Sequence, residues 1–315
     1  FIFSKKDGQL KGVSVDNRKI SFANGPRFIG ARRADRSLDQ FYNHDDEKAK
    51  EKDRTYSEFP DAAVFTKLDV KEDGGNLVVT ANYKLGNLDK TQWTINPSGE
   101  LALDYTYNFS GVVDLMGIRF DYPEDQVISK RWLGAGPYRV WQNRIHGTQY
   151  DVWENDYNDP IPGETFTYPE FKGYFGDVSW MNIQTKEGTI SLTNETPDAY
   201  IGVYQPRDGR DRLLYTLPES GISVLNVIPP VRNKVNSTDL CGPSSQPKWV
   251  NGPQTTLRWV PFLFNLLKFE NGIQCLFRLL FRHKNMVVVI CCYYICANVF
   301  LCKFSRESSC QAHCI

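Results

Sequence analysis

Short β-branched and aromatic runs alternate with turn-forming residues along most of this chain. Residues 64–70 and 77–83 flank Asp-Gly-Gly-Asn at 73–76, and residues 181–184 and 189–192 flank another glycine-containing turn. Helical periodicity is nearly absent from the same region. Consecutive hairpins without intervening helices predict large antiparallel sheets packed as a sandwich, and they disfavour a doubly wound α/β fold.

One run also predicts which of its side chains are buried. Residues 101–107, Leu-Ala-Leu-Asp-Tyr-Thr-Tyr, alternate between large apolar and smaller or polar side chains. Successive side chains of a strand point to opposite faces of the sheet. We therefore expect a strand here with one buried face and one wetter face.

Charge and length exclude some classes of protein. The 315 residues include 37 basic and 37 acidic side chains, so no net field attracts a polyanion, and no local run of Lys and Arg replaces one. We therefore expect no nucleic-acid partner.

The chain opens at Phe1 without a leader-like segment, which suggests a fragment. A periplasmic or extracellular location would follow only if the full-length protein carries a signal peptide.

Composition changes abruptly near the C-terminus. Only Cys241 lies in the first 274 residues, whereas seven cysteines crowd the last 41, and no Gly, Pro or Asp follows Gly272. We therefore expect a main domain at 1–264 and an apolar tail at 265–315 outside the fold. The cysteines lack paired C-x₂-C spacing, so we expect no zinc site, and the sequence indicates no other metal or cofactor.

The tail leaves two alternatives open. Residues 286–302 are almost uninterrupted apolar sequence, about 17 residues long, which is the lower limit for a membrane-crossing helix. A membrane partner follows only if this segment is a real anchor. The alternative, which we prefer, is a translated extension beyond the natural end of the domain.

The segments that are most informative about function combine glycine, proline and aromatic residues. They are RWLGAGPY at 131–138, WQNR at 141–144, YPEFKGY at 168–174 and DVSW at 177–180. Gly134 and Gly136 suggest a tight backbone turn. The flat faces of Trp and Tyr suit the C–H surface of a sugar ring, but they equally suit a core between two sheets.

The order and spacing of these segments resemble the C-terminal, small-chain region of family 2 glycoside hydrolases of the β-galactosidase type. The resemblance covers roughly residues 1–264, and the matching positions are Trp132, Gly134, Gly136, Pro137, Arg144, Tyr168, Pro169, Gly173, Asp177, Val178 and Trp180. It implies an all-β, antiparallel supersandwich of the galactose mutarotase-like kind. It also implies that both catalytic carboxyl groups lie on a (β/α)₈ barrel upstream. The sequence contains no βα alternation that could build such a barrel, so we expect no catalytic residue here and no hydrolysis by this chain alone.

The resemblance suggests a supporting role in carbohydrate binding. Trp249 is the candidate for an aromatic residue at the rim of a sugar pocket, and its alternative is an exposed edge aromatic. Tyr138 and Trp141 could contact sugar or serve only the fold, and Glu170 could accept a sugar hydroxyl or stabilise a turn. Departures from the family pattern, such as Glu170-Phe171 and Ser179, leave the sugar and the linkage open.

Two other functions remain open. An aldose mutarotase would need a histidine acid and a glutamate base, and of four histidines only His146 lies in a motif region. A non-catalytic carbohydrate-binding or interaction module, held at a membrane by the tail, is the main alternative. The expected partners are therefore a carbohydrate and the upstream barrel of the same protein.

Overall fold

The computed structural model describes most of the chain as β structure. The described residues are 1–15, 18–33, 56–156, 173–195, 198–204, 221–230, 242–251, 257–265, 274–280 and 287–295, the last three through their backbone alone. The motif segment 168–174 lies outside them except for Gly173 and Tyr174. Within these ranges the structure contains strands and short 3₁₀ turns, so the all-β prediction is confirmed.

The first sheet has ten strands, and its pairings are antiparallel. In spatial order it contains β16 (Tyr200–Val203), β17 (Ile222–Val227), β11 (Leu115–Asp121), β4 (Ala23–Arg33), β2 (Leu10–Val15), β1 (Ile2–Ser4), β21 (Val287–Ile295) and β20 (Gln274–Leu280), with β3 (Arg18–Ile20) on β2 and β5 (Tyr56–Glu58) on β4.

The second sheet has nine antiparallel strands. In spatial order it contains β13 (Gln149–Asp156), β12 (Val127–Gly136), β14 (Trp180–Thr185), β15 (Gly188–Asn194), β19 (Leu257–Asn265), β9 (Leu101–Tyr107), β8 (Leu88–Ile95), β7 (Asn76–Lys84) and β6 (Val64–Asp73). A separate two-stranded ribbon pairs β10 (Gly111–Val113) with β18 (Lys248–Val250).

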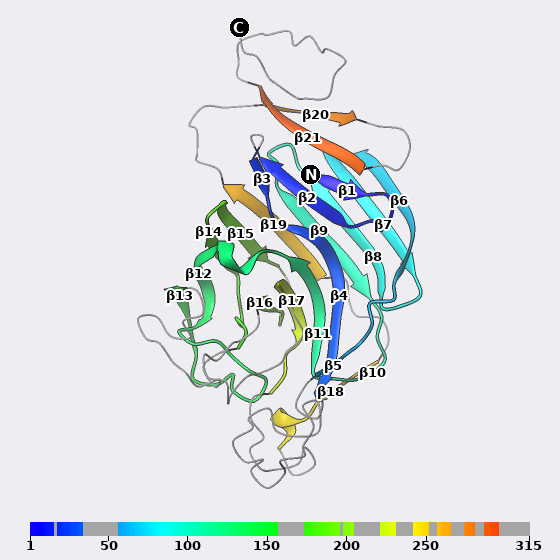
Figure 1. The fold of residues 1–315 in the computed structure, drawn as a ribbon. Helices are drawn as coiled ribbons and strands as arrows, with labels where there is room; N and C mark the ends of the chain where they lie inside the picture. The colour runs from blue at the N-terminus through cyan, green and yellow to red at the C-terminus, as the bar shows by residue number, and fades with distance from the viewer. Residues whose placement is uncertain are drawn as a thin grey trace.

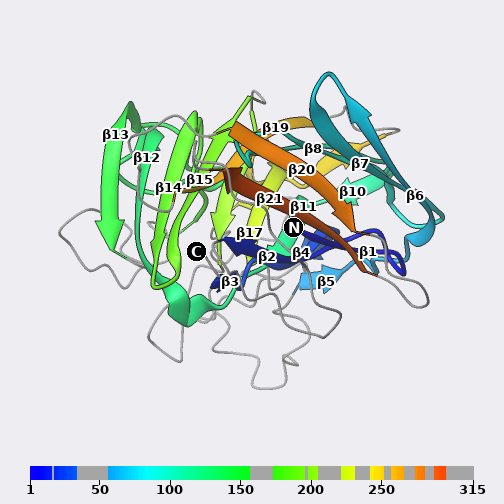
Figure 2. The ribbon, with the colours of Figure 1, turned by 90° about the horizontal axis from the view of Figure 1, so that it is seen from above.

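The two large sheets face each other (Figures 1 and 2), and aromatic side chains are part of the core that both sheets contribute to. Phe3 of β1 and Phe120 of β11 each place a ring 6.0 Å from that of Trp93 on β8, in edge-to-face geometry. All three side chains are at most 1% exposed. Each ring removes a large apolar area from water and joins strands of opposite sheets, so these contacts hold the sandwich closed.

The hairpins predicted from sequence are present. Strands β6 and β7 are joined through Gly74 and Gly75, both at positive φ, as their turn chemistry requires. Strand β9 shows strict alternation between buried and intermediate positions over 101–107, which confirms the predicted two-faced strand. These elements depend on local pattern, which is why the sequence predicts them correctly.

The prediction of a tight turn at Gly134 and Gly136 was wrong. Both glycines lie within β12, and neither has positive φ. A Cβ on Gly136 would lie 2.4 Å from Cδ1 of Trp153, and one on Gly134 would lie 3.0 Å from the carbonyl oxygen of Asp177. These glycines therefore allow close packing of neighbouring segments, and they do not turn the chain.

The described part of the C-terminal tail differs from the sequence expectation. Residues 274–280 and 287–295 form the hairpin β20–β21, and β21 pairs with β1 at the edge of the first sheet (Figure 1). The tail therefore contributes strands to that sheet where we expected it to lie outside the fold. A helix over 286–302 is wrong for 287–295, because a run of Val, Ile and Tyr favours an extended backbone. Among the described residues, no helix is long and apolar enough to cross a membrane.

A carboxylate joins the two sheets at one end of the sandwich. Glu187, in the β14–β15 turn, accepts hydrogen bonds from the backbone N–H and hydroxyl of Ser21, at 2.9 and 2.6 Å, and from the hydroxyl of Tyr122 at 2.9 Å. Burial alone would raise the pKa of Glu187, but these hydrogen bonds outweigh it and the pKa lies below its usual value. The ionised carboxylate therefore stabilises this inter-sheet contact.

Candidate functional site

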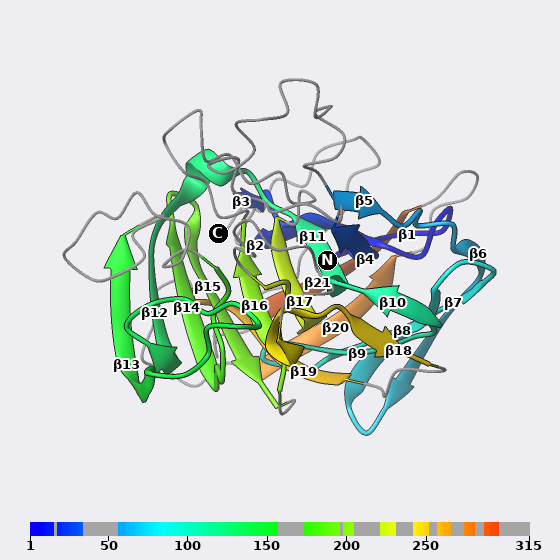
Figure 3. The same ribbon diagram turned by 90° about the horizontal axis from the view of Figure 1, so that it is seen from below.

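Trp249 is the most exposed aromatic side chain among those the structure places. It lies in β18, which pairs with β10 (Figure 3), and it faces Val112 across the ribbon. Of its surface, 71% is exposed. The ribbon continues into Asn251, whose Oδ1 lies 3.1 Å from the hydroxyl of Ser110. The exposed indole presents a flat apolar face and a polar N–H edge, so a ligand with a matching surface could stack on it.

Trp141 has the opposite environment. It is 0% exposed, and its ring meets that of Tyr174 edge-to-face with centroids 5.7 Å apart. Both rings belong to a small second core that includes Ile29, Leu115 and Leu225 of the ten-stranded sheet. In this structure Trp141 anchors its loop to that sheet and has no free face for a sugar.

The two sequence motifs meet at this loop. Val140 and Tyr174 exchange backbone hydrogen bonds of 2.8 and 2.9 Å, which joins residues that follow β12 to residues that precede β14. A Cβ on Gly173 would lie 2.3 Å from the carbonyl oxygen of Val140. The glycine at 173 is therefore required by the close approach of the two backbones.

Tyr138 lies half-buried within the same loop. Its hydroxyl donates a hydrogen bond of 3.3 Å to the carbonyl oxygen of His146, while the side chain of His146 is exposed. A Cβ on Gly147 would lie 2.5 Å from that hydroxyl. Tyr138 therefore contributes to the shape of the loop, and its intermediate exposure leaves part of it accessible.

The structure brings the Tyr138–Trp141 loop next to the segment that carries Trp249. The side-chain amide of Gln142 donates to the carbonyl oxygens of Ser244 and Gln246, at 3.0 and 2.7 Å. Asn143 adds a hydrogen bond of 3.2 Å to the hydroxyl of Ser245. This role of Gln142 cannot be predicted from the sequence, because nothing local shows that residues about 100 positions apart will meet.

Glu170 lies outside the described residues, so its role remains a prediction. Of the four candidate residues, the structure therefore places Tyr138 and Trp141 in one loop and Trp249 in a segment hydrogen-bonded to that loop.

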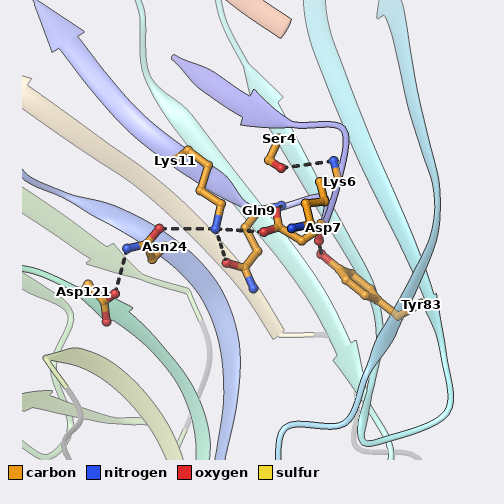
Figure 4. Close-up of polar contacts among 8 residues, drawn as sticks. All are labelled: Ser4, Lys6, Asp7, Gln9, Lys11, Asn24, Tyr83 and Asp121. Atoms are coloured by element: carbon orange, nitrogen blue, oxygen red, sulfur yellow. Dashed lines mark hydrogen bonds and ion pairs between the residues drawn. The ribbon is translucent and has the colours of Figure 1, made fainter. Parts of the chain in front are cut away.

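A second polar cluster lies at the N-terminal strands (Figure 4). Lys11 forms an ion pair of 2.9 Å with Asp7 and donates to the side-chain oxygens of Gln9 and Asn24, at 3.0 and 3.3 Å. Asn24 donates in turn to Asp121 at 2.9 Å. The cluster thereby ties β2 and β4 to the end of β11, which makes a structural role its simplest explanation.

The titration behaviour of this cluster agrees with that role. Burial would raise the pKa of Asp7, but contacts with Lys11 and the backbone N–H of Gln9 hold it below its usual value. Burial raises the pKa of Tyr83, whose hydroxyl donates to the carbonyl oxygen of Asp7 at 3.0 Å, to about 12. Neither group is poised for proton transfer near neutral pH.

Among the described residues, no group of three or more His, Cys, Asp or Glu side chains could hold a metal ion. The buried Asp114 faces Arg32, with 3.4 Å between its Oδ2 and the guanidinium Nε. Around Trp249, the structure presents an exposed aromatic face with polar neighbours, and this arrangement is suited to binding a ligand.

Comparison with known proteins identifies the family. A family model described as the β-galactosidase small chain matches residues 1–248. The match includes both motif segments and reaches Lys248, directly before Trp249. A search of curated proteins found no match.

Proposed function

Because the chain belongs to the β-galactosidase small-chain family, we propose that it is the carbohydrate-binding and supporting region of a β-galactosidase-like glycoside hydrolase. The family implies association with a larger catalytic part. The reactive carboxyl groups belong to that larger part, and this chain contributes no catalytic residue.

The observation that carries the proposal is the exposure of Trp249. The indole is held on a strand whose partner β10 leads through Asp114 into β11, an interior strand of the ten-stranded sheet. An aromatic ring on a supported strand loses little conformational entropy when a ligand stacks on it. The C–H face of a sugar is a matching surface, and such a platform orients substrate without entering the covalent chemistry.

Substitution of Trp249 in the complete enzyme tests this function. Trp249→Ala is expected to raise KM for an aryl galactoside about tenfold, equivalent to about 1.4 kcal/mol, and to change kcat less than twofold. That pattern signifies loss of binding shared by ground state and transition state. Steady-state kinetics would measure both constants, and the thermal midpoint should stay within a few degrees because the side chain is exposed.

Leu85→Ala is a matched control. Leu85 is 73% exposed in the turn between β7 and β8, so its truncation removes a similarly exposed apolar side chain elsewhere. We expect wild-type KM from this control. Unchanged KM in Trp249→Ala would refute the role of Trp249 in carbohydrate binding.

A further inference from the structure

The segment that carries Trp249 is held by side chains from a distant loop. The 3₁₀ turn η6 (Pro243–Ser245) precedes β18, and its last carbonyl groups need partners from outside the turn. Gln142 supplies two of these contacts, to the carbonyl oxygens of Ser244 and Gln246 at 3.0 and 2.7 Å. Gln142 thereby fixes the backbone only three residues before the indole.

Gln142 is itself attached to the core. Its backbone N–H donates to the carbonyl oxygen of Pro229 at 3.0 Å, and the preceding residue, Trp141, is completely buried. Its side chain therefore extends from a rigid base. The backbone at Gln142 is therefore already ordered when its side-chain amide makes these hydrogen bonds.

The other support for Trp249 comes from its own short ribbon, in which Val113 of β10 and Val250 of β18 are buried in the main core. Strand β18 has only three residues, and its sheet partner is the equally short β10. A two-stranded ribbon of this length is marginally stable by itself. Contacts from outside the ribbon therefore help to orient the indole, and among the described residues Gln142 contributes two side-chain hydrogen bonds of this kind.

We propose that Gln142 is a positioning residue for Trp249, acting through the backbone of residues 244–246. The inference rests on the proposed function, because it assigns Gln142 to the same carbohydrate-binding surface. Gln142 does not touch the sugar. It holds the strand that presents the aromatic face, so its loss weakens binding only while Trp249 is present.

A double-mutant cycle in the complete enzyme tests this dependence. The variants are Gln142→Met, which keeps the side-chain length but donates no hydrogen bond, Trp249→Ala, and the two combined. We expect Gln142→Met to raise KM for an aryl galactoside three- to tenfold with kcat within twofold. In the Trp249→Ala background the same substitution should leave KM unchanged. Gln184→Met, at an exposed position of β14, is the matched control and should retain wild-type KM.

The outcomes separate this inference from the proposed function. A KM effect of Gln142→Met that is equally large with and without Trp249 would overturn the positioning role, as would an unchanged KM in the single variant. If Trp249→Ala alone leaves KM unchanged, both the proposed function and the positioning role are overturned. If Trp249→Ala raises KM but Gln142→Met does not, only the positioning role is lost.

A spectroscopic measurement covers the case in which Gln142→Met folds poorly. Gln142→Asn keeps an amide but shortens its reach, so it should follow the same dependence on Trp249 in the kinetic cycle. The part of the acrylamide quenching that is lost in Trp249→Ala is assigned to Trp249. In the folded Gln142→Asn variant, this part should differ from that of the wild type. Identical quenching together with wild-type KM would contradict the inference.

Discussion

Trp141 and Trp249 show how one residue type serves two purposes in this molecule. Trp141 is 0% exposed and contributes to a core, whereas Trp249 is 71% exposed and contributes to a surface. Composition and local sequence do not distinguish them, because both stand in polar, turn-rich surroundings. The difference arises from which strands their loops meet.

At the same scale, Glu187 predicts a pH-dependent contribution to stability. Its folded pKa lies below its usual value, so the contribution is fully present above the unfolded pKa of about 4.3 and is lost as pH falls through the folded pKa. Glu187→Gln should lower stability by about 1–2 kcal/mol near neutral pH, since it weakens hydrogen bonds to a charged acceptor. Near pH ~3 the difference from wild type should shrink, because the wild-type carboxyl is then increasingly protonated.

Urea unfolding at the two pH values measures this effect. Glu72→Gln, on the exposed face of β6, is the control and should match wild type at both. A Glu187→Gln deficit of the same size at both pH values would exclude the charge-dependent contact.

At the scale of elements, β19 connects the two halves of the nine-stranded sheet. It pairs with β15 on one side and β9 on the other, so four strands lie on each side of it. A chain ending at residue 265 keeps β19, whereas a chain ending at 256 lacks it. We expect the first to unfold cooperatively and the second to lose its cooperative transition, because the central pairing of that sheet is gone.

Circular dichroism during urea titration would measure the two transitions. A chain ending at 256 with the same midpoint and slope as a chain ending at 265 would show that β19 is dispensable. The test also bears on the predicted domain boundary at 264, which is the next-to-last residue of β19.

Elements also explain how much could be predicted from sequence. The hairpins β6–β7 and β14–β15 and the alternation in β9 follow from neighbouring residues, so local pattern predicts them. The contact from Gln142 to Ser244 and the packing at Gly136 join segments distant in sequence or depend on a neighbouring strand. The strand character of 287–295 was missed because a long apolar run fits a helix or a buried strand equally well.

At the scale of the whole molecule, the described chain is a sandwich of two large sheets without a (β/α)₈ barrel. Its family is that of a β-galactosidase small chain, and its most exposed aromatic residue lies on a ribbon outside both sheets. These features fit a region that binds and supports, while another part of the enzyme carries out the reaction. A non-catalytic module would instead bind glycan alone and leave the rates of an enzyme lacking it unchanged.

The central claim is tested most directly by aryl galactoside turnover, measured for the isolated 315-residue chain, for the larger catalytic part, and for the two together. We predict no turnover by the chain alone, weak turnover by the catalytic part, and restored turnover when both are present. Turnover by the isolated chain, or full activity of the catalytic part without it, would contradict the account.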